Sequence, residues 1–255
     1  MSTVDELVPH LKKLRLSGIL ETLELRSRQA VEDDLTHQEF LYRLLADEVE
    51  RREGKQLSQR LRRASFEPGR TLEDFNFLFN PAIPKTRLVD LATCHFVERN
   101  ENVLLVGPAG VGKSHLAQAL GHRACQVGHD VVFTGAHEMF AQLRAARADG
   151  SYERKLQRFT NPAVLVLDDL GLRRLAHDEP LDLYEIIRQR YERGSTIITS
   201  NRALDEFPSL FGDPLLASAA MDRLLHHSHV LVIEGESYRN PRRAQGKGKE
   251  VESKE

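Results

Sequence analysis

The sequence predicts an α/β fold, in which a parallel sheet is flanked by helices and preceded by a small all-helical domain. From Asn102 onward, short apolar runs alternate with amphipathic stretches, which is typical of strands and helices that alternate along the chain. Before about residue 65, apolar residues recur every three or four positions, which is the period of a helical face. A glycine-rich segment, 107–114, lies directly between a predicted strand and a predicted helix.

Length and composition set the broad limits. The chain has 255 residues and a formal net charge of -2, which suits one large core or one core with a small accessory domain. Cys94 and Cys125 lie far apart without a CxxC-like spacing, so neither a disulfide framework nor a zinc site is indicated. No apolar run approaches the roughly 18 residues of a membrane span, and no signal-peptide pattern opens the chain. We expect reduced thiols, no membrane contact and a cytoplasmic location.

Residues 1–66 are expected to form the helical domain. A capping-box pattern, Thr36 with Glu39, precedes an apolar helical stretch. Between Arg51 and Arg70 the chain carries seven basic residues against two acids. This stretch is therefore locally basic although the whole chain is not, and local patches rather than net charge set contact with phosphate groups.

Residues 67–100 are expected to be a linker, because prolines and glycine interrupt the helical period there. The aromatic side chains of Phe75, Phe77 and Phe79 are expected to pack on the next domain rather than to stack on bases. Residues 101–240 hold the predicted sheet. Residues 241–255 form a basic tail with almost no apolar side chain, which is expected to be disordered.

Short apolar runs and amphipathic stretches give the elements of the larger domain. Strands are predicted at 103–106, 131–134, 164–167 and 196–199, with a fifth candidate at 231–233. Helices are predicted at 114–127, 136–147 and 181–193, two of which are followed by glycine.

A phosphate-binding loop is predicted directly after the first strand. Its residues fit GxxxxGK[ST]: Gly107, Pro108, Ala109, Gly110, Val111, Gly112, Lys113 and Ser114. Glycines let backbone N–H groups surround phosphate oxygens, and the following helix directs its positive end at the same anion. Lys113 is expected to reach the β- and γ-phosphates and the Ser114 hydroxyl to ligate Mg²⁺. A glycine turn without a ligand is the alternative.

Polar side chains end two further strands. Asp168 and Asp169 follow an apolar run, at the strand end that faces the phosphates in open α/β sheets. Asp168 is predicted to hold Mg²⁺ through water, and Asp169 to orient or deprotonate the attacking water, slowly because it is shorter than Glu. A helix N-cap or a solvated strand end is the alternative. Asn201 is a candidate for bridging the γ-phosphate and the water, or an ordinary turn residue. The sequence lacks an NKxD motif, which favours adenine over guanine.

These motifs, followed in order by Asp222-Arg223 and Ser237-Tyr238-Arg239, resemble those of AAA+ ATPases. More narrowly, the chain resembles the IstB family, ATPases that assist bacterial insertion-sequence transposases, and the related DnaC helicase loaders. The narrower resemblance covers nearly the whole chain. It rests on the blocks LVPHLKKLRLSGI, RTLEDF, LDDLG, FGDP and DRLLHH.

The resemblance implies roles for two arginines. Arg223 corresponds to an arginine finger, which reaches the γ-phosphate of a neighbouring subunit, and Arg239 to a second sensor arginine. A planar guanidinium suits both tasks because its donors can neutralise charge on the transferred phosphoryl group. The family further implies ATP and Mg²⁺ as cofactors, a homo-oligomer with ATP at subunit interfaces, and a transposase encoded by the same element as partner.

The resemblance also implies that the helical domain contacts double-stranded DNA. The basic stretch agrees, since phosphate contacts supply most sequence-independent affinity, although a solvated helix face is a serious rival. The candidate contacts are Arg51, Arg52, Arg60, Arg62 and Arg63. We expect a protein that promotes transposition; a helicase loader or a small-molecule kinase is the alternative. His226, His227 and His229 lack the spacing of a zinc site.

Overall fold

The computed structural model describes residues 3–238 of the chain and divides into two compact units, Met1–Gln59 and Arg60–Glu255. The boundary falls inside a helix, earlier than the predicted domain end at residue 66. Phe66 belongs to the larger unit, where its ring lies 6.2 Å from that of Phe133. The predicted tail, residues 241–255, lies outside the described residues.

The smaller unit consists of α1 (Thr3–Lys13), α2 (Ser17–Glu32) and most of α3 (His37–Ala64). Ile19, Leu23 and Leu44 form its core. The predicted capping box is confirmed: the Thr36 N–H donates to Glu39 Oε2 at 2.9 Å, and the Glu39 N–H donates to Thr36 Oγ1 at 3.3 Å. The sequence therefore sets the start of α3 locally.

A buried carboxylate joins α2 to α3. Glu48 is 3% exposed, and its Oε2 accepts a hydrogen bond from the Gly18 N–H at 2.5 Å. Burial alone would raise the pKa of Glu48, but hydrogen bonds from Gly18 and Arg52 hold this pKa below its ordinary value. A Cβ on Gly18 would lie 2.8 Å from the Glu48 Cα, so glycine allows the two helices to approach this closely.

The larger unit is built on a five-stranded parallel sheet in the order β2-β3-β4-β1-β5. The strands are β1 (Asn102–Val106), β2 (Val131–Gly135), β3 (Val164–Asp168), β4 (Ser195–Ser200) and β5 (Ser228–Val232). The predicted fold class is confirmed. The fifth strand begins three residues before the predicted 231–233, because polar Ser228 and His229 already pair with Asn102 and Val103 of β1.

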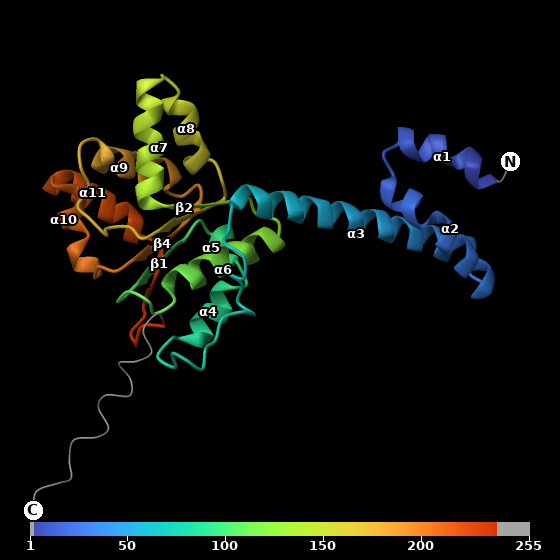
Figure 1. Ribbon diagram of the computed structural model, residues 1–255, viewed down its shortest axis with the longest axis horizontal. Helices are drawn as coiled ribbons and strands as arrows, with labels where there is room; N and C mark the ends of the chain where they lie inside the picture. Colours follow the sequence, from blue (N-terminus) through green and yellow to red (C-terminus); the bar gives the residue numbers. More distant parts are fainter. Residues whose placement is uncertain (1–2, 239–255) are drawn as a thin grey trace, which may run out of the picture. The chain divides into compact units, whose positions relative to one another are not determined.

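Helices cover both faces of this sheet (Figure 1). Helix α6 (Lys113–Gln126) covers one face. The elements that pack on the other face are α7 (Ala136–Ala148), α8 (Tyr152–Thr160), α9 (Glu179–Arg190), η1 (Leu204–Glu206), α10 (Pro208–Phe211) and α11 (Pro214–Leu225). The helices α7, α9 and α11 share one apolar core with alternate strand residues such as Leu104, Leu165 and Ile198. Among the described helices, none is long and apolar enough to cross a membrane.

The segment predicted as a linker, residues 67–100, belongs to the larger unit. It contains α4 (Lys85–Leu91) and α5 (His95–Glu98), which bury Leu88, Leu91 and Phe96. These helices are short, and the prolines before them hide their period in the sequence. The segment is thus a folded part of the unit and not only a connection.

Candidate nucleotide-binding site

The glycine-rich loop between β1 and α6 has the backbone of an anion site. Gly107, Gly110 and Gly112 have φ angles of +148°, +84° and +101°, a region in which a Cβ would be strained. Helix α6 begins at Lys113, directly after the loop. Successive amides at a helix N-terminus bind phosphate oxygens readily, because the helix dipole and the N–H groups favour the same negative charge.

Lys113 lies folded over this loop. Its side chain is nearly buried, and Nζ donates to the carbonyl oxygens of Gly107 at 2.8 Å and Pro108 at 2.7 Å, and to Asn201 Oδ1 at 2.5 Å. The structure therefore brings the predicted phosphate lysine together with the predicted sensor amide, which lies 88 residues away in the sequence. Nζ is held by oxygens, the same kind of partner that a phosphate would offer.

Thr199, on the buried strand β4, holds the two acidic residues at the end of β3. Its hydroxyl donates to Asp168 Oδ1 at 2.5 Å and accepts from the Asp169 N–H at 2.8 Å. Asp169 has a φ of +57°, which is uncommon for a residue other than glycine. In the sequence, Thr199 is only the last residue of the predicted strand 196–199, and nothing there assigns it a role. Its partners lie on another strand, so the sequence does not reveal them.

A cavity of about 550 Å³ lies against the loop. Its lining includes the predicted residues Ala109, Gly110, Gly112, Lys113, Ser114, Asp169 and Asn201. The other lining residues, which sequence reasoning did not assign to the site, are Arg70, Asp74, Phe75, Asn76, His115, Leu172 and Tyr238. Arg70 to Phe75 are the RTLEDF block, which supports the family resemblance. The residues of this block do not by themselves indicate that they line a nucleotide site.

The chain after β5 packs on the phosphate loop. The Ile233 N–H donates to the Val106 carbonyl at 2.7 Å, and the Tyr238 N–H donates to the Gly110 carbonyl at 2.8 Å. A Cβ on Gly110 would lie 2.1 Å from Ser237 Oγ, so a side chain there would displace this segment. Arg239 follows directly but lies outside the described residues, and its sensor role stays a prediction.

Arg223 does not line this cavity in the described part of the chain. It lies on α11, where its guanidinium donates to the Ala219 carbonyl at 2.9 Å and sits 5.7 Å from the centre of the Tyr184 ring. An arginine finger acts on the nucleotide of another subunit, so this position is compatible with the predicted role without testing it.

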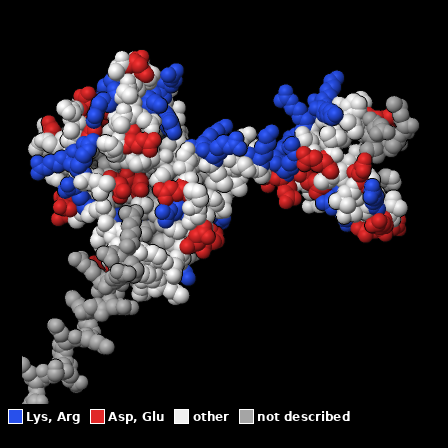
Figure 2. Space-filling model, viewed as in Figure 1, with Lys and Arg blue, Asp and Glu red and all other residues white. Residues whose placement is uncertain are grey.

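The candidate DNA-contacting arginines lie along α3, where Lys and Arg side chains gather (Figure 2). Three of them have acidic neighbours: Arg51 lies 3.3 Å from Glu21, Arg52 lies 2.6 Å from Glu48, and Arg63 lies 3.9 Å from Asp130. Arg60 is half-buried and Arg62 is exposed. The acidic neighbours reduce the positive charge that the first three offer to phosphate groups.

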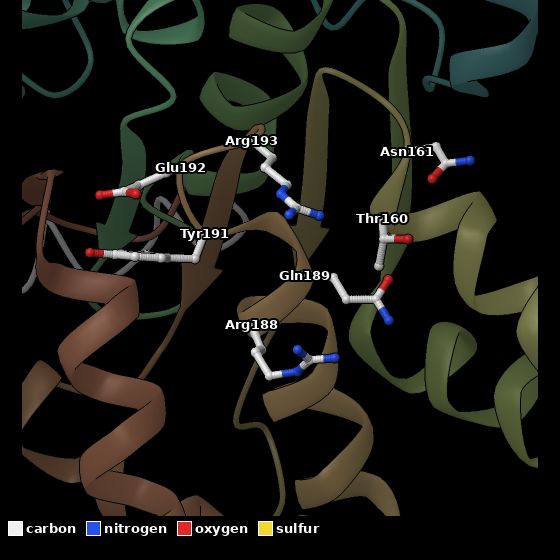
Figure 3. Close-up of a pocket in the computed structure, with 7 residues that line it drawn as sticks. All are labelled: Thr160, Asn161, Arg188, Gln189, Tyr191, Glu192 and Arg193. Carbon is white, nitrogen blue, oxygen red and sulfur yellow. The ribbon is translucent and has the colours of Figure 1, made fainter.

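A second cavity, of about 760 Å³, lies near the amino ends of strands β3 and β4 (Figure 3). It is lined where α8 leads into β3 and α9 leads into β4, by Thr160, Asn161, Arg188, Gln189, Tyr191, Glu192 and Arg193. It is the larger of the two but lies at the amino ends of the strands, away from the glycine loop. Parallel sheets bind nucleotides at the carboxyl ends, so the smaller cavity is the candidate site.

The glycine loop, the buried lysine and the acidic strand end, on a parallel sheet with strand β1 between β4 and β5, define a P-loop protein of the AAA+ class. The chain belongs to the family of IstB-like ATP binding proteins, whose model matches residues 9–246. Among curated relatives, an insertion-sequence ATP-binding protein of Mycobacterium tuberculosis is 43% identical, covering 93% of this chain and 94% of that protein. The IS21 ATP-binding protein of Pseudomonas aeruginosa is 40% identical, with coverages of 94% and 89%.

Solved structures share the fold of the larger unit. The DnaC helicase loader is 28% identical with a TM-score of 0.51, covering 58% of this chain and 87% of that one. DnaI is 22% identical with a TM-score of 0.56, with coverages of 64% and 90%. These similarities agree with the predicted AAA+ fold and the predicted relation to helicase loaders.

Proposed function

We propose that this chain is a Mg²⁺-dependent ATPase that assembles on double-stranded DNA and promotes insertion-sequence transposition together with a transposase of the same element. ATP binding is the established property of its family. The observation that carries the proposal of hydrolysis is the cluster at the carboxyl edge of the sheet. There Lys113, Asn201 and Asp169 line one cavity, and the Thr199 hydroxyl joins the Asp169 backbone to the neighbouring Asp168 carboxylate.

The loop residues would bind the triphosphate. Backbone amides of 107–114 would surround the phosphates, and Lys113 would exchange its loop carbonyls for phosphate oxygens. The residues present fit a magnesium ion, because the Ser114 hydroxyl and the Asp168 carboxylate are the hard oxygen donors that it prefers. When bound, the ion would neutralise charge on the phosphates.

Hydrolysis would depend on the side chains at the ends of β3 and β4. Asp169 would orient the attacking water or accept its proton, and Asn201 would hold the water against the γ-phosphate. Thr199 supports this assignment because its hydroxyl fixes the Asp168 carboxylate and the Asp169 backbone at once. The shorter Asp at 169 favours slow turnover, which suits a timer on assembly.

Several observations support DNA and a transposase as partners. The names of the curated relatives place those proteins in insertion sequences, and the family relation extends over 93% of this chain for the first of them. The arginines along α3 offer phosphate contacts. Arg223 lies outside the lining of its own chain's described cavity, a position that is compatible with a role across a subunit interface.

The Arg223→Ala variant tests this assembly. We expect it to bind ATP with the parent's affinity but to lose hydrolysis stimulated by duplex DNA, because the finger acts only on a neighbouring subunit's nucleotide. A guanidinium of this kind contributes on the order of a thousandfold in rate. Steady-state ATP hydrolysis with and without DNA, with calorimetry for ATP, measures both. The control is Arg193→Ala, because Arg193 is exposed and lines the second cavity, near the amino ends of the strands. Unchanged stimulation would remove Arg223 from the finger role.

A helicase loader is the second candidate function, favoured by the similarity to the DnaC helicase loader over 58% of this chain. Both functions use the same ATPase module, so the site does not separate them. Capture of purified replicative helicase, compared with capture of the transposase from the same element, discriminates. Binding to the helicase alone would overturn the transposition proposal.

A further inference from the structure

Residues 70–76, here called the strap, form one wall of the nucleotide cavity. Four of the strap residues line it: Arg70, Asp74, Phe75 and Asn76. The strap has a turn of its own, in which the Thr71 hydroxyl donates to Asp74 Oδ2 at 2.7 Å and accepts from the Asp74 N–H at 3.2 Å. Its shape is therefore set locally, but its position over the cavity depends on contacts with other segments.

The residues on either side of the strap are hydrogen-bonded to other segments of the larger unit. Before it, the Glu67 N–H donates to Gln118 Oε1 at 2.8 Å, which ties the chain to α6. After it, Asn80 Nδ2 donates to the Glu234 carbonyl at 2.7 Å. Between these two attachments, the strap meets the phosphate loop and the start of α6 through Phe75 and His115.

His115 makes two different contacts with the strap. Its Nε2 lies 2.8 Å from the Thr71 carbonyl oxygen, and because a carbonyl only accepts, Nε2 carries the proton and donates. Its ring also meets Phe75 edge-on, with the centroids 5.0 Å apart and the planes at 84°. His115 follows Ser114 directly in the phosphate-loop motif, so one residue connects the start of α6 to two points of the strap.

Phe75 is seated on the loop itself. A Cβ on Gly112 would lie 2.8 Å from Phe75 Cε2, so the ring occupies the space that a side chain at 112 would need. The same ring meets Phe77 edge-on, with the centroids 4.9 Å apart. Phe75 is thus held between the loop, His115 and its own neighbour, and displacement of the strap would open the cavity beside Lys113 and Ser114.

We propose that His115 is a positioning residue that holds the strap against the phosphate loop and thereby slows the release of bound nucleotide. The inference rests on the proposed ATP binding at this cavity. His115 contributes through Thr71 and Phe75, and its effect appears in the rate of nucleotide exchange. The strap and His115 together set how long each nucleotide stays bound.

Three variants separate the two contacts. His115→Ala removes both, His115→Phe keeps a ring against Phe75 without the donor, and His115→Gln keeps a donor for the Thr71 carbonyl. A hydrogen bond and an aromatic contact together predict release about tenfold faster for His115→Ala. Stopped-flow release of a fluorescent ribose-labelled ADP measures it. We expect a smaller acceleration for His115→Phe and partial rescue by His115→Gln.

His122→Ala is the matched control. His122 is also half-buried on α6 and also meets an aromatic ring, that of Phe66 at 6.3 Å, but it does not line the cavity. We expect it to leave nucleotide release unchanged. Hydrogen exchange of the 71–75 amides, which we expect to quicken in His115→Ala, reports the position of the strap without nucleotide.

Three results would overturn the inference, and they are distinguishable. If the parent protein binds no labelled ADP or ATP, the proposed function fails and this inference fails with it. If the parent binds but His115→Ala releases nucleotide at the parent's rate, ATP binding stands and the positioning role of His115 is refuted. Equal acceleration by His122→Ala would also refute it, because any loss of packing on α6 would then suffice.

Discussion

Lys113→Ala is expected to weaken ATP binding on the order of a hundredfold or more and to abolish hydrolysis. Each charge-assisted hydrogen bond to a phosphate oxygen contributes about 1.5 to 3 kcal/mol, and Nζ can make two of them to the β- and γ-phosphates. The near-complete burial of this side chain strengthens the effect, since water competes poorly for the ammonium group. Calorimetric titration of purified protein with ATP and Mg²⁺ measures the loss.

Controls separate loss of binding from loss of structure. Removal of the Lys113 ammonium also leaves two loop carbonyls and the Asn201 amide without this donor, so thermal unfolding of the variant is measured alongside. Lys155→Ala, a half-buried lysine on α8, is the matched substitution and should bind ATP as the parent does. ATP affinity equal to the parent's in a folded Lys113→Ala protein would contradict the assignment of the site.

The phosphate loop and the sheet could be predicted from the sequence because their signals are local. The motif 107–114 fixes a strand, a turn and a helix start within about fifteen residues, and hydrophobic runs mark the strands. The meeting of Lys113 with Asn201 could be anticipated as well, because the carboxyl ends of parallel strands lie at one edge of a sheet.

The rest of the cavity depends on contacts between distant segments. Nothing in the sequence near Phe75 indicates that its ring fills the space beside Gly112, or that Ser237 crowds Gly110. The partner of Arg51 is equally invisible, because Glu21 reaches it by the packing of α2 on α3, whereas Glu48 lies one helical turn before Arg52 and could be anticipated. Such contacts follow from tertiary packing, which the local pattern does not encode.

The end of α9 shows how a buried contact overrides the local pattern. The sequence predicts a helix over 181–193, ended by Gly194, but the helix ends at Arg190. The Gly194 N–H still bonds the Arg190 carbonyl at 3.0 Å. The side chain of Arg190 turns into the core, where it is 2% exposed. Periodicity alone treats this arginine as a surface residue near a helix C-terminus.

Arg190 holds the connections that lead into β3 and β4. Its guanidinium donates to five carbonyls, those of Phe159, Thr160, Pro162, Ala163 and Ser195, and to the Thr196 hydroxyl, over distances of 2.5 to 3.2 Å. Burial lowers the pKa of Arg190 to about 9, so the group is still charged at neutral pH. A planar fork of five N–H donors is the side chain able to satisfy so many backbone acceptors at once.

Arg190→Met is therefore expected to destabilise the larger unit by about 3 to 5 kcal/mol, because it keeps the apolar stem but leaves several buried carbonyls unpaired. Arg190→Lys should recover only part of this loss, since an ammonium group cannot reach acceptors spread around a plane. Arg188→Met is the matched control: the same helix carries it, its side chain is half exposed, and it pairs with Glu185 at 2.6 Å. Urea unfolding followed by circular dichroism should give a lower midpoint for both Arg190 variants and the parent's midpoint for Arg188→Met. A parental midpoint for Arg190→Met would mean that water satisfies these carbonyls as well as the guanidinium does.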